Sequence, residues 1–294
     1  MAQLLLDEMP RRLFTCTPTR LAAFEDCPRR YRMTYLDRPA PPKGPPWAHT
    51  SLGTSAHNAL RRWWEEPEPR RTPERAAALV RACWVADGWR DEEQSAAARE
   101  RVATMCERYA AGLDPADEPR AVERQVATRT DVLAFHGRVD RLDERDGELV
   151  VVDYKTGRRP PQDGDARTSA ALALYAFATE RMLRQRCRRV ELHHLPTGRV
   201  VAAEHTDESL ARHVRRAESI ATDAAAAAER LAGGQPADLA FPPRPGSLCS
   251  WCDFRRHCPE GQTAGPAQAP WAGVEYLTEA EAEADGAPVE PAHG

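Results

Sequence analysis

Lysine is almost absent from this 294-residue chain, which carries only Lys43 and Lys155 against 39 arginines. Aromatic residues are scarce at 6%, and no apolar run approaches the roughly 18–20 residues of a membrane-spanning helix. A glycine-rich phosphate loop is also missing, because Pro42 and Tyr154 precede the two lysines where a P-loop requires glycine. These absences argue against a membrane span and an ATP-driven motor, and they predict a cytoplasmic globular protein.

Cations are absent from the C-terminal end of the chain. Residues 260–294 hold seven acidic residues and no Lys or Arg, so the net charge of −4 becomes +3 for residues 1–259. The end of the chain also lacks periodic apolar positions, and we expect residues 261–294 to form a disordered acidic tail. Two interpretations of this tail stay open, a solubilising segment or a competitor of a nucleic-acid ligand.

Hydrophobic periodicity predicts an α/β domain over residues 15–260, preceded by an N-terminal extension over 1–14. Thr17 and Pro18 open a helical segment that Pro28 interrupts. Further helices are expected over 53–65, 74–87, 93–111, 167–185 and 207–232. Strands are expected over 120–130, 132–142 and 148–155, and two more within 188–204. This order predicts a central mixed sheet flanked by helices, with a helical insert at about 66–115.

One hairpin makes the strand register predictable. The dipeptide Asp146-Gly147 in GRVDRLDERDGELVVVDYKTG favours a two-residue type I′ turn, which would pair Arg145 with Glu148. Continuing this pairing places Asp140 opposite Asp153 on one face of the sheet, with Cβ atoms about 4.5–5.5 Å apart. A register slip of one residue would put the two aspartates on opposite faces.

Two facing aspartates at the ends of apolar strands repel each other unless a cation lies between them. Carboxylates of Asp140 and Asp153, with the backbone carbonyl of Tyr154, are oxygen ligands that suit Mg²⁺ or Mn²⁺ better than zinc. Lys155 shares the face of Asp153 and is the candidate catalytic cation. The alternative is that Lys155 only neutralises Asp153 as a surface ion pair.

Asp140 in GRVDRLD, followed by Asp153, Tyr154 and Lys155, resembles the D…(D/E)-x-K signature of the PD-(D/E)xK nuclease superfamily, in its RecB-like exonuclease branch. That branch has a Gly-x-x-x-His helix upstream, and GTSAH supplies the histidine as His57. Without the neighbouring motifs, His57 would be interpreted as a partly buried structural histidine. The resemblance implies a restriction-endonuclease-like core in which His57 joins the metal site.

The same family commonly has a Gln-x-x-x-Tyr helix after the lysine strand. The segment ALALY keeps Tyr175 but has Ala171 at the glutamine position. The resemblance implies that Tyr175 faces DNA or supports the site.

Near the C-terminus, CSWCDFRRHC gives the spacing Cys249-x2-Cys252-x5-Cys258, a trio that needs a fourth ligand. Cys27 is the candidate, because Cys27 and Cys258 are both followed by proline, as in some cluster-binding cysteines. Four thiolates can also hold zinc, so a zinc knuckle over residues 246–259 stays open. The other four cysteines are expected to be small buried hydrophobes: Cys16, Cys83, Cys106 and Cys187.

A lone early cysteine with a late C-x2-C-x5-C around a D…DYK core resembles iron–sulfur nucleases, namely AddB-type subunits and CRISPR-associated RecB-like exonucleases. The resemblance covers about residues 15–260 and implies a structural 4Fe-4S cluster that joins the N- and C-terminal segments. It also implies a partner such as a separate helicase or another DNA-processing protein.

Basic and aromatic residues beside Cys27 suggest a DNA-binding surface. In CPRRYRMTY we expect Arg29, Arg30 and Tyr31 to bind phosphates and bases, as in single-strand grooves. RRWW at 61–64 has the same composition, but buried anchors on a helix are the favoured interpretation. The site residues and the resemblance together predict a Mg²⁺- or Mn²⁺-dependent DNA nuclease, and the resemblance implies an exonuclease that prefers single strands and acts in repair or related processing. The alternative is a catalytically idle DNA-binding or scaffold subunit with a structural cluster or zinc site.

Overall fold

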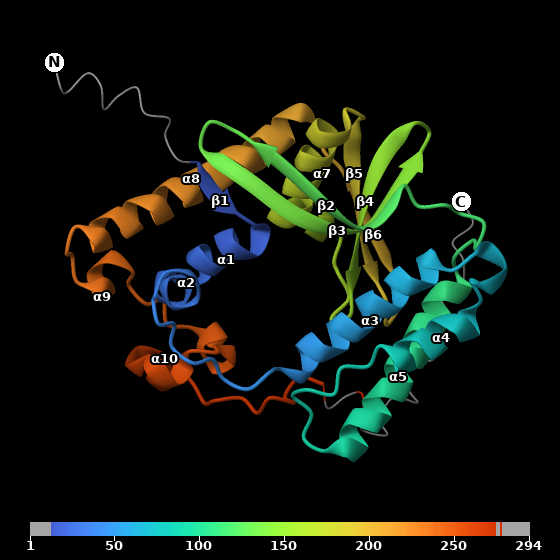
Figure 1. The fold of residues 1–294 in the computed structure, drawn as a ribbon, viewed down its shortest axis with the longest axis horizontal. Helices are drawn as coiled ribbons and strands as arrows, with labels where there is room; N and C mark the ends of the chain where they lie inside the picture. The colour runs from blue at the N-terminus through green and yellow to red at the C-terminus, as the bar shows by residue number, and fades with distance from the viewer. Residues whose placement is uncertain (1–12, 275–276, 278–294) are drawn as a thin grey trace.

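A mixed sheet of six strands forms the centre of the computed structural model, which describes residues 13–274 and residue 277 (Figure 1). The strand order is β1-β3-β4-β5-β6, and β2 pairs with the long strand β3. The strands are β1 (Phe14–Cys16), β2 (Ala121–Arg129), β3 (Leu133–Arg145), β4 (Glu148–Lys155), β5 (Cys187–His194) and β6 (Val200–Glu204). Pairs β1–β3 and β4–β5 are parallel and the others antiparallel, which confirms the expected mixed α/β fold.

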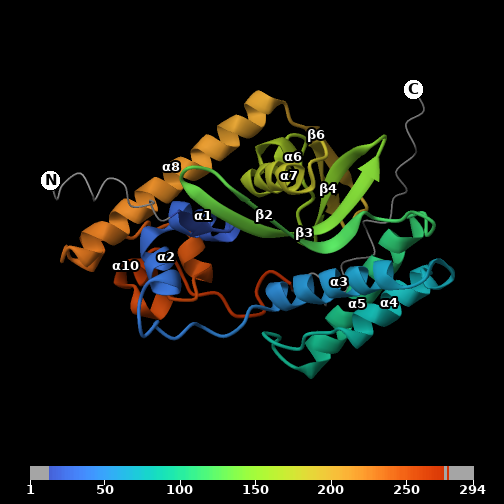
Figure 2. The same cartoon turned by 45° about the horizontal axis from the view of Figure 1, so that its top comes forward.

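Helices cover both faces of this sheet (Figures 1 and 2). Their bounds are α1 (Pro18–Asp26), α2 (Pro28–Tyr35), α3 (Ala48–Glu65), α4 (Pro73–Ala82), α5 (Glu92–Ala111), α6 (Asp165–Thr168), α7 (Ala170–Leu183), α8 (Asp207–Ala232), α9 (Ala237–Ala240) and α10 (Pro259–Thr263). In β4, Leu149 and Val151 pack in the hydrophobic cluster of α1, α7 and α8, whereas Val150 and Val152 pack with α3, α4 and α5. Alternation of apolar residues on both faces explains why the Val-rich strand is central.

Local sequence signals set several element ends where they were expected. The Thr17 side chain accepts a hydrogen bond from the backbone N–H of Arg20 at the start of α1, and Pro28 begins α2 after the break at Cys27. Asp146 and Gly147 have positive φ angles of 52° and 79°, as a type I′ turn requires. The predicted pairing of β3 with β4 is therefore confirmed, from Arg145↔Glu148 to Arg141↔Val152.

Strand β3 is paired differently along its two edges. β2 pairs with it from Leu142 back to Ala134. On the other edge, β1 pairs as far as Phe135 and β4 begins pairing only at Arg141. Residues 136–140 thus lie where the sheet forks, and Asp140 is at the point where β3 and β4 separate.

The side-chain alternation of β3 breaks at the same point. Val139 packs in the cluster of α7 and α8, but the guanidinium of Arg141 lies 5.1 Å from the ring centroid of Trp64 on α3. Residues two apart on a regular strand share a face, so the strand changes face at Asp140. In β2, Glu123 has a positive φ of 48° opposite this point, between the pairs Val122↔Arg141 and Arg124↔Val139.

Two boundaries differ from those expected. The N-terminal extension was expected to reach residue 14, but Phe14 already belongs to β1, a three-residue strand too short for periodicity to reveal. Residues 261–274 belong to the folded structure instead of a disordered tail, because Val274 is buried with α3–α5 and the backbone N–H of Ala48 binds the carbonyl of Pro270. The rest of the expected tail, apart from residue 277, lies outside the described residues. Within the described part, no helix is long and apolar enough to span a membrane.

Candidate active site

Three neighbouring strands bring carboxylates to the fork of the sheet. Asp140 comes from β3, Asp153 from β4 and Glu123 from β2. Glu123 lies between two residues of β2 that pair with Arg141 and Val139, so it is across from Asp140. Asp153 follows the last β3–β4 pair, Arg141↔Val152, and is across from Asp140 on the other side. The backbone N–H of Tyr154 donates a 2.9 Å hydrogen bond to Asp140 Oδ2, which fixes the central carboxylate where the strands separate.

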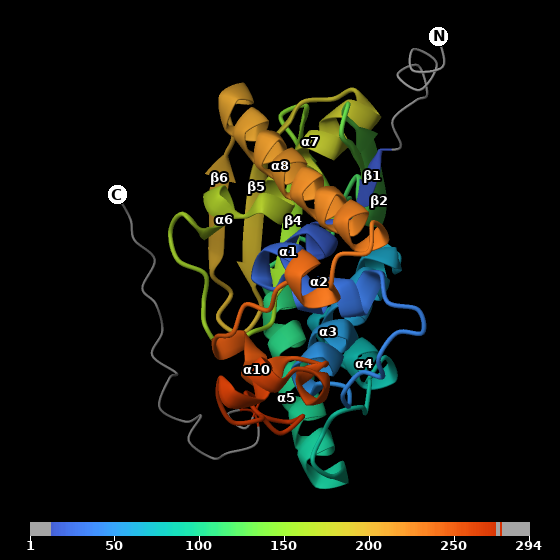
Figure 3. The same cartoon turned by 90° about the vertical axis from the view of Figure 1, so that its left-hand side faces the viewer.

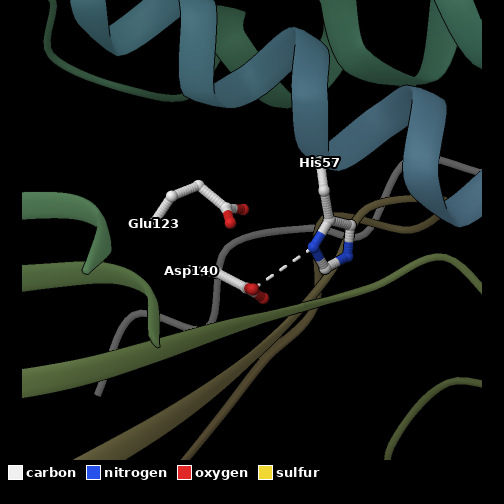
Figure 4. Close-up of side chains that lie close together, drawn as sticks. All are labelled: His57, Glu123 and Asp140. Carbon is white, nitrogen blue, oxygen red and sulfur yellow. Dashed lines mark ion pairs between the residues drawn. The ribbon is translucent and has the colours of Figure 1, made fainter. Parts of the chain in front are cut away.

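Helix α3 adds His57, whose ring points toward Asp140, with Glu123 on the other side (Figure 4). Its Nδ1 lies 3.3 Å from Asp140 Oδ1. Burial disfavours protonation of His57, but the hydrogen bond to Asp140 and the charges of Asp140, Asp153 and Glu123 outweigh it and raise the pKa of this histidine. His57, Glu123 and Asp140 each offer a ligand atom, and these three atoms lie within 4.8 Å of one another.

Glu123 is the site residue that the sequence analysis missed. Burial raises its pKa, as does the charge of Asp140, whereas Arg138 acts in the opposite direction. The signal that would have found Glu123 is the β2–β3 hairpin, whose pairs run from Arg129↔Ala134 to Ala121↔Leu142. Its turn, TDVL, lacks the Asn-Gly or Asp-Gly dipeptide from which the register of the β3–β4 hairpin could be predicted.

Asp153 and Lys155 form a close pair at the end of β4. Lys155 Nζ lies 2.7 Å from Asp153 Oδ2, and the lysine side chain is 49% exposed while the aspartate is mostly buried. Burial raises the pKa of Asp153 and Asp140 adds to this shift, although Lys155 works against it. The expected sharing of one face by Asp153 and Lys155 is thus present in the structure.

Tyr154 points the other way. Its side chain is buried on the α3 face, and its hydroxyl accepts a 3.2 Å hydrogen bond from Trp64 Nε1. Trp63 and Trp64 are buried, which confirms the interpretation of RRWW as helix anchors. Tyr154 therefore helps to hold α3, and with it His57, against the sheet; a metal contact through its carbonyl stays a prediction.

Tyr175 on α7 lies near the same carboxylates. Burial raises its pKa to about 12, with contributions from Asp153 and Asp140, and the backbone N–H of Arg138 donates to its hydroxyl. Its ring packs against Gly137, where an added Cβ would lie 2.4 Å from Tyr175 Cε1. This contact explains the glycine on β3. DNA binding by Tyr175 stays a prediction.

All four candidate cysteines line one cavity, between α2 and the C-terminal segment. Cys27 is the residue between α1 and α2, and Cys249, Cys252 and Cys258 come from short turns around residues 247–258. Helices α2 and α10 lie side by side in all three views, so the two ends of the fold meet here (Figure 3). Of the other cysteines, Cys16, Cys106 and Cys187 are buried as expected, and Cys83 is only partly buried at the end of α4.

The predicted DNA-binding role of the residues beside Cys27 needs correction. Tyr31 is 1% exposed, and its hydroxyl accepts hydrogen bonds from Arg20. Arg29 is 5% exposed and donates to Cys258 Sγ at 3.2 Å while pairing with Glu260. Both side chains are thus unavailable to DNA, because Arg29 lines the cysteine cavity and Tyr31 packs in the hydrophobic cluster against Phe24 and Phe241. Arg30 is partly exposed, and its contact with DNA stays a prediction.

Of the comparisons with known proteins, the match to a family model identifies the family of the chain. No curated protein matches the chain. One solved structure, titled "Crystal structure of SSO0001", is similar at 15% sequence identity and a TM-score of 0.38, over 87% of this chain and 91% of that chain. The model of the PD-(D/E)XK nuclease superfamily matches residues 15–259, which include every residue of the site above. Since this match spans most of the sequence, the chain belongs to the PD-(D/E)XK nuclease superfamily.

Proposed function

We propose that this metal-dependent nuclease is a Mg²⁺- or Mn²⁺-dependent DNA exonuclease of the RecB-like branch, that it prefers single strands, and that it acts in DNA repair or related processing in the cytoplasm. The observation that carries the proposal is the convergence of His57, Glu123 and Asp140, whose ligand atoms lie within 4.8 Å of one another. The Asp153–Lys155 pair lies beside them at the end of β4.

One nitrogen and several carboxylate oxygens fit a divalent metal, because they place negative charge around a small space that the chain itself neutralises only in part. When bound, such an ion would polarise a phosphate oxygen and make water a stronger nucleophile. Asp140 is held in position by the N–H of Tyr154, and Trp64 ties Tyr154 to α3. These contacts fix the distance between His57 and the carboxylates before any ion binds.

Lys155 has a different task from the ligands. Its ammonium is bound to Asp153 yet half exposed, so it can reach a substrate phosphate or an attacking water without leaving the site. A compact ammonium on a flexible stem suits this position better than a broad guanidinium. This explains a lysine in a chain that otherwise uses arginine almost exclusively.

For the cysteine cavity we propose a structural 4Fe-4S cluster held by Cys27, Cys249, Cys252 and Cys258. All four thiols line one cavity, so a single bound group can take all of them as ligands. The early cysteine and the late C-x2-C-x5-C spacing resemble those of iron–sulfur nucleases, which favours a cluster over tetrahedral zinc.

The test of the nuclease proposal uses anaerobically purified protein, end-labelled single- and double-stranded DNA, and Mn²⁺. We expect metal-dependent release of short products from an end, faster on single strands, and none with EDTA. Iron and acid-labile sulfide are measured on the same sample to test for the cluster. Zinc without sulfide would show that the four cysteines form a zinc knuckle. Absence of cleavage with intact DNA binding would favour the idle, scaffold interpretation.

A further inference from the structure

The row of carboxylates carries a cation at each end. On β4, Asp153 pairs with Lys155. On β2, Glu123 pairs with Arg138, whose Nε lies 2.7 Å from Glu123 Oε2. The exposures are also alike, since the Arg138 side chain is 66% exposed and that of Glu123 only 14%. Arg138 thus occupies on one side of Asp140 the place that Lys155 occupies on the other.

The backbone around Arg138 is fixed. It precedes Asp140 by two residues on β3 and pairs with Gln125 of β2. Its backbone N–H donates to the Tyr175 hydroxyl, and the neighbouring Gly137 packs against the Tyr175 ring. The guanidinium is therefore mobile only through its own side chain, from a main chain anchored next to the metal site.

Neutralising Glu123 is one role for Arg138, but that role ends when a divalent ion binds. A cation among His57, Glu123 and Asp140 would supply the positive charge that Glu123 now receives from Arg138. A guanidinium offers five donors in a planar fork that matches a phosphate, and its contact with Glu123 uses the Nε edge.

We propose that Arg138 binds a backbone phosphate of the DNA strand at the metal site, exchanging Glu123 for the phosphate when metal and substrate are present. This inference rests on the proposed nuclease function. It assigns Arg138 to substrate binding, in contrast with a residue that only positions Glu123.

Salt dependence separates these two roles. Each phosphate contact contributes about 0.7 to the slope of log K against log salt concentration for single strands. A residue that only positions Glu123 would change metal affinity and leave this slope alone. Arg186 provides a matched control, since it is 59% exposed and pairs with Glu148, at the start of β4.

The experiment measures binding of a labelled single-stranded oligonucleotide over a range of KCl, with Mn²⁺, for Arg138→Ala, Arg138→Lys and Arg186→Ala. All are made in an Asp153→Asn background to prevent cleavage. We expect Arg138→Ala to bind about tenfold more weakly at low salt, with a slope smaller by about 0.7. Arg138→Lys should keep the slope, and Arg186→Ala should match the parent.

Manganese affinity, measured without DNA, completes the test. We expect it to be unchanged or higher in Arg138→Ala, because Glu123 loses a competing cation. An unchanged salt slope in Arg138→Ala, or weaker Mn²⁺ binding with normal DNA binding, would overturn the inference. If the parent protein itself binds no DNA, the proposed function fails instead, whatever the Arg138 variants do.

Discussion

At the scale of single residues, the site depends on ion pairs between a mostly buried carboxylate and an exposed cation. Asp153 is mostly buried, and burial raises its pKa, so the ammonium of Lys155 stabilises a charge that the fold alone disfavours. The same holds for Glu123 and Arg138 across Asp140. Exposed cations therefore make it possible for three carboxylates to lie close together at the fork of the sheet.

Replacing Lys155 by arginine should separate a catalytic role from that of an ion pair. Lys155→Arg keeps the charge, and at a surface pair would cost no more than about 1 kcal/mol. At a catalytic position we expect single-turnover cleavage of single-stranded DNA to fall by roughly two orders of magnitude, about 3 kcal/mol of transition-state stabilisation. Lys155→Ala is the comparison. Wild-type cleavage by Lys155→Arg would reduce this lysine to a surface charge.

Glu123→Gln tests the ligand that periodicity did not reveal. The substitution keeps the shape of the side chain and removes one negative charge from the metal site, so we expect Mn²⁺ to bind about tenfold more weakly. Titration calorimetry measures this directly. Glu144→Gln, at an exposed carboxylate on the same hairpin, is the control and should bind Mn²⁺ normally. Equal affinities would remove Glu123 from the metal site.

Sequence reasoning named Asp140, Asp153, Lys155 and His57, which lie together in the structure, but it did not name Glu123, and the difference is physical. Asp146-Gly147 dictates a turn with positive φ angles, and a two-residue turn fixes the register of both strands. Glu123 reaches the site through an unusual backbone conformation in a strand whose turn has no such signature. The burial of Arg29 and Tyr31 was equally unreadable, because it depends on partners more than 200 residues away, such as Cys258 for Arg29, or on long-range packing of rings.

At the scale of elements, β3 organises the site. It is paired by β2 on one edge and shared between β1 and β4 on the other, and the unpaired stretch ends at Asp140. Helix α7 closes this stretch through Tyr175, whose ring occupies the space above Gly137. Periodicity predicted β3, β4 and α7 nearly correctly, but the fork arises from β1, which is only three residues long.

Gly137→Ala should therefore disturb the site without touching a ligand. The new Cβ would lie 2.4 Å from the ring of Tyr175, so ring or strand must move. We expect a loss of about 1–3 kcal/mol in the free energy of unfolding, typical of overpacking, together with reduced cleavage. Urea denaturation measures the first effect. The double variant Gly137→Ala with Tyr175→Phe should stay unstable, whereas Tyr175→Ala should relieve the clash; failure of that relief would contradict the packing argument.

At the scale of the whole molecule, the cysteine cavity joins the beginning of the described chain to its end. Residues 247–258, which carry the three late cysteines, are also hydrogen-bonded to the segment that leads into α3. Asp253 in the cysteine segment accepts hydrogen bonds from the backbone N–H of Gly44 and, at 2.8 Å, from Trp47 Nε1. Trp47 immediately precedes α3, the helix that carries His57. Asp253 thus holds the N-terminal end of the helix that carries His57.

Cys27→Ala should break the connection between the two ends of the fold at the cysteine cavity. A group bound by Cys27 and the three late cysteines closes almost the whole chain into a loop, so its loss should free both ends. We expect loss of the visible absorbance of the proposed cluster and rapid proteolysis on either side of the core, read by mass spectrometry. Cys106→Ala is the control thiol, since it is buried in the helical insert. Identical spectra for wild type and Cys27→Ala would exclude Cys27 as a ligand.

The proposed metal-dependent phosphodiesterase site is built on Asp140, Asp153 and their neighbours. Asp153→Asn tests it most directly, because the change removes one charge from the site and preserves its shape. Cleavage of labelled single-stranded DNA in saturating Mn²⁺ should collapse, while thermal stability and DNA binding persist or strengthen as repulsion of phosphate falls. Near-normal cleavage by Asp153→Asn would contradict the account.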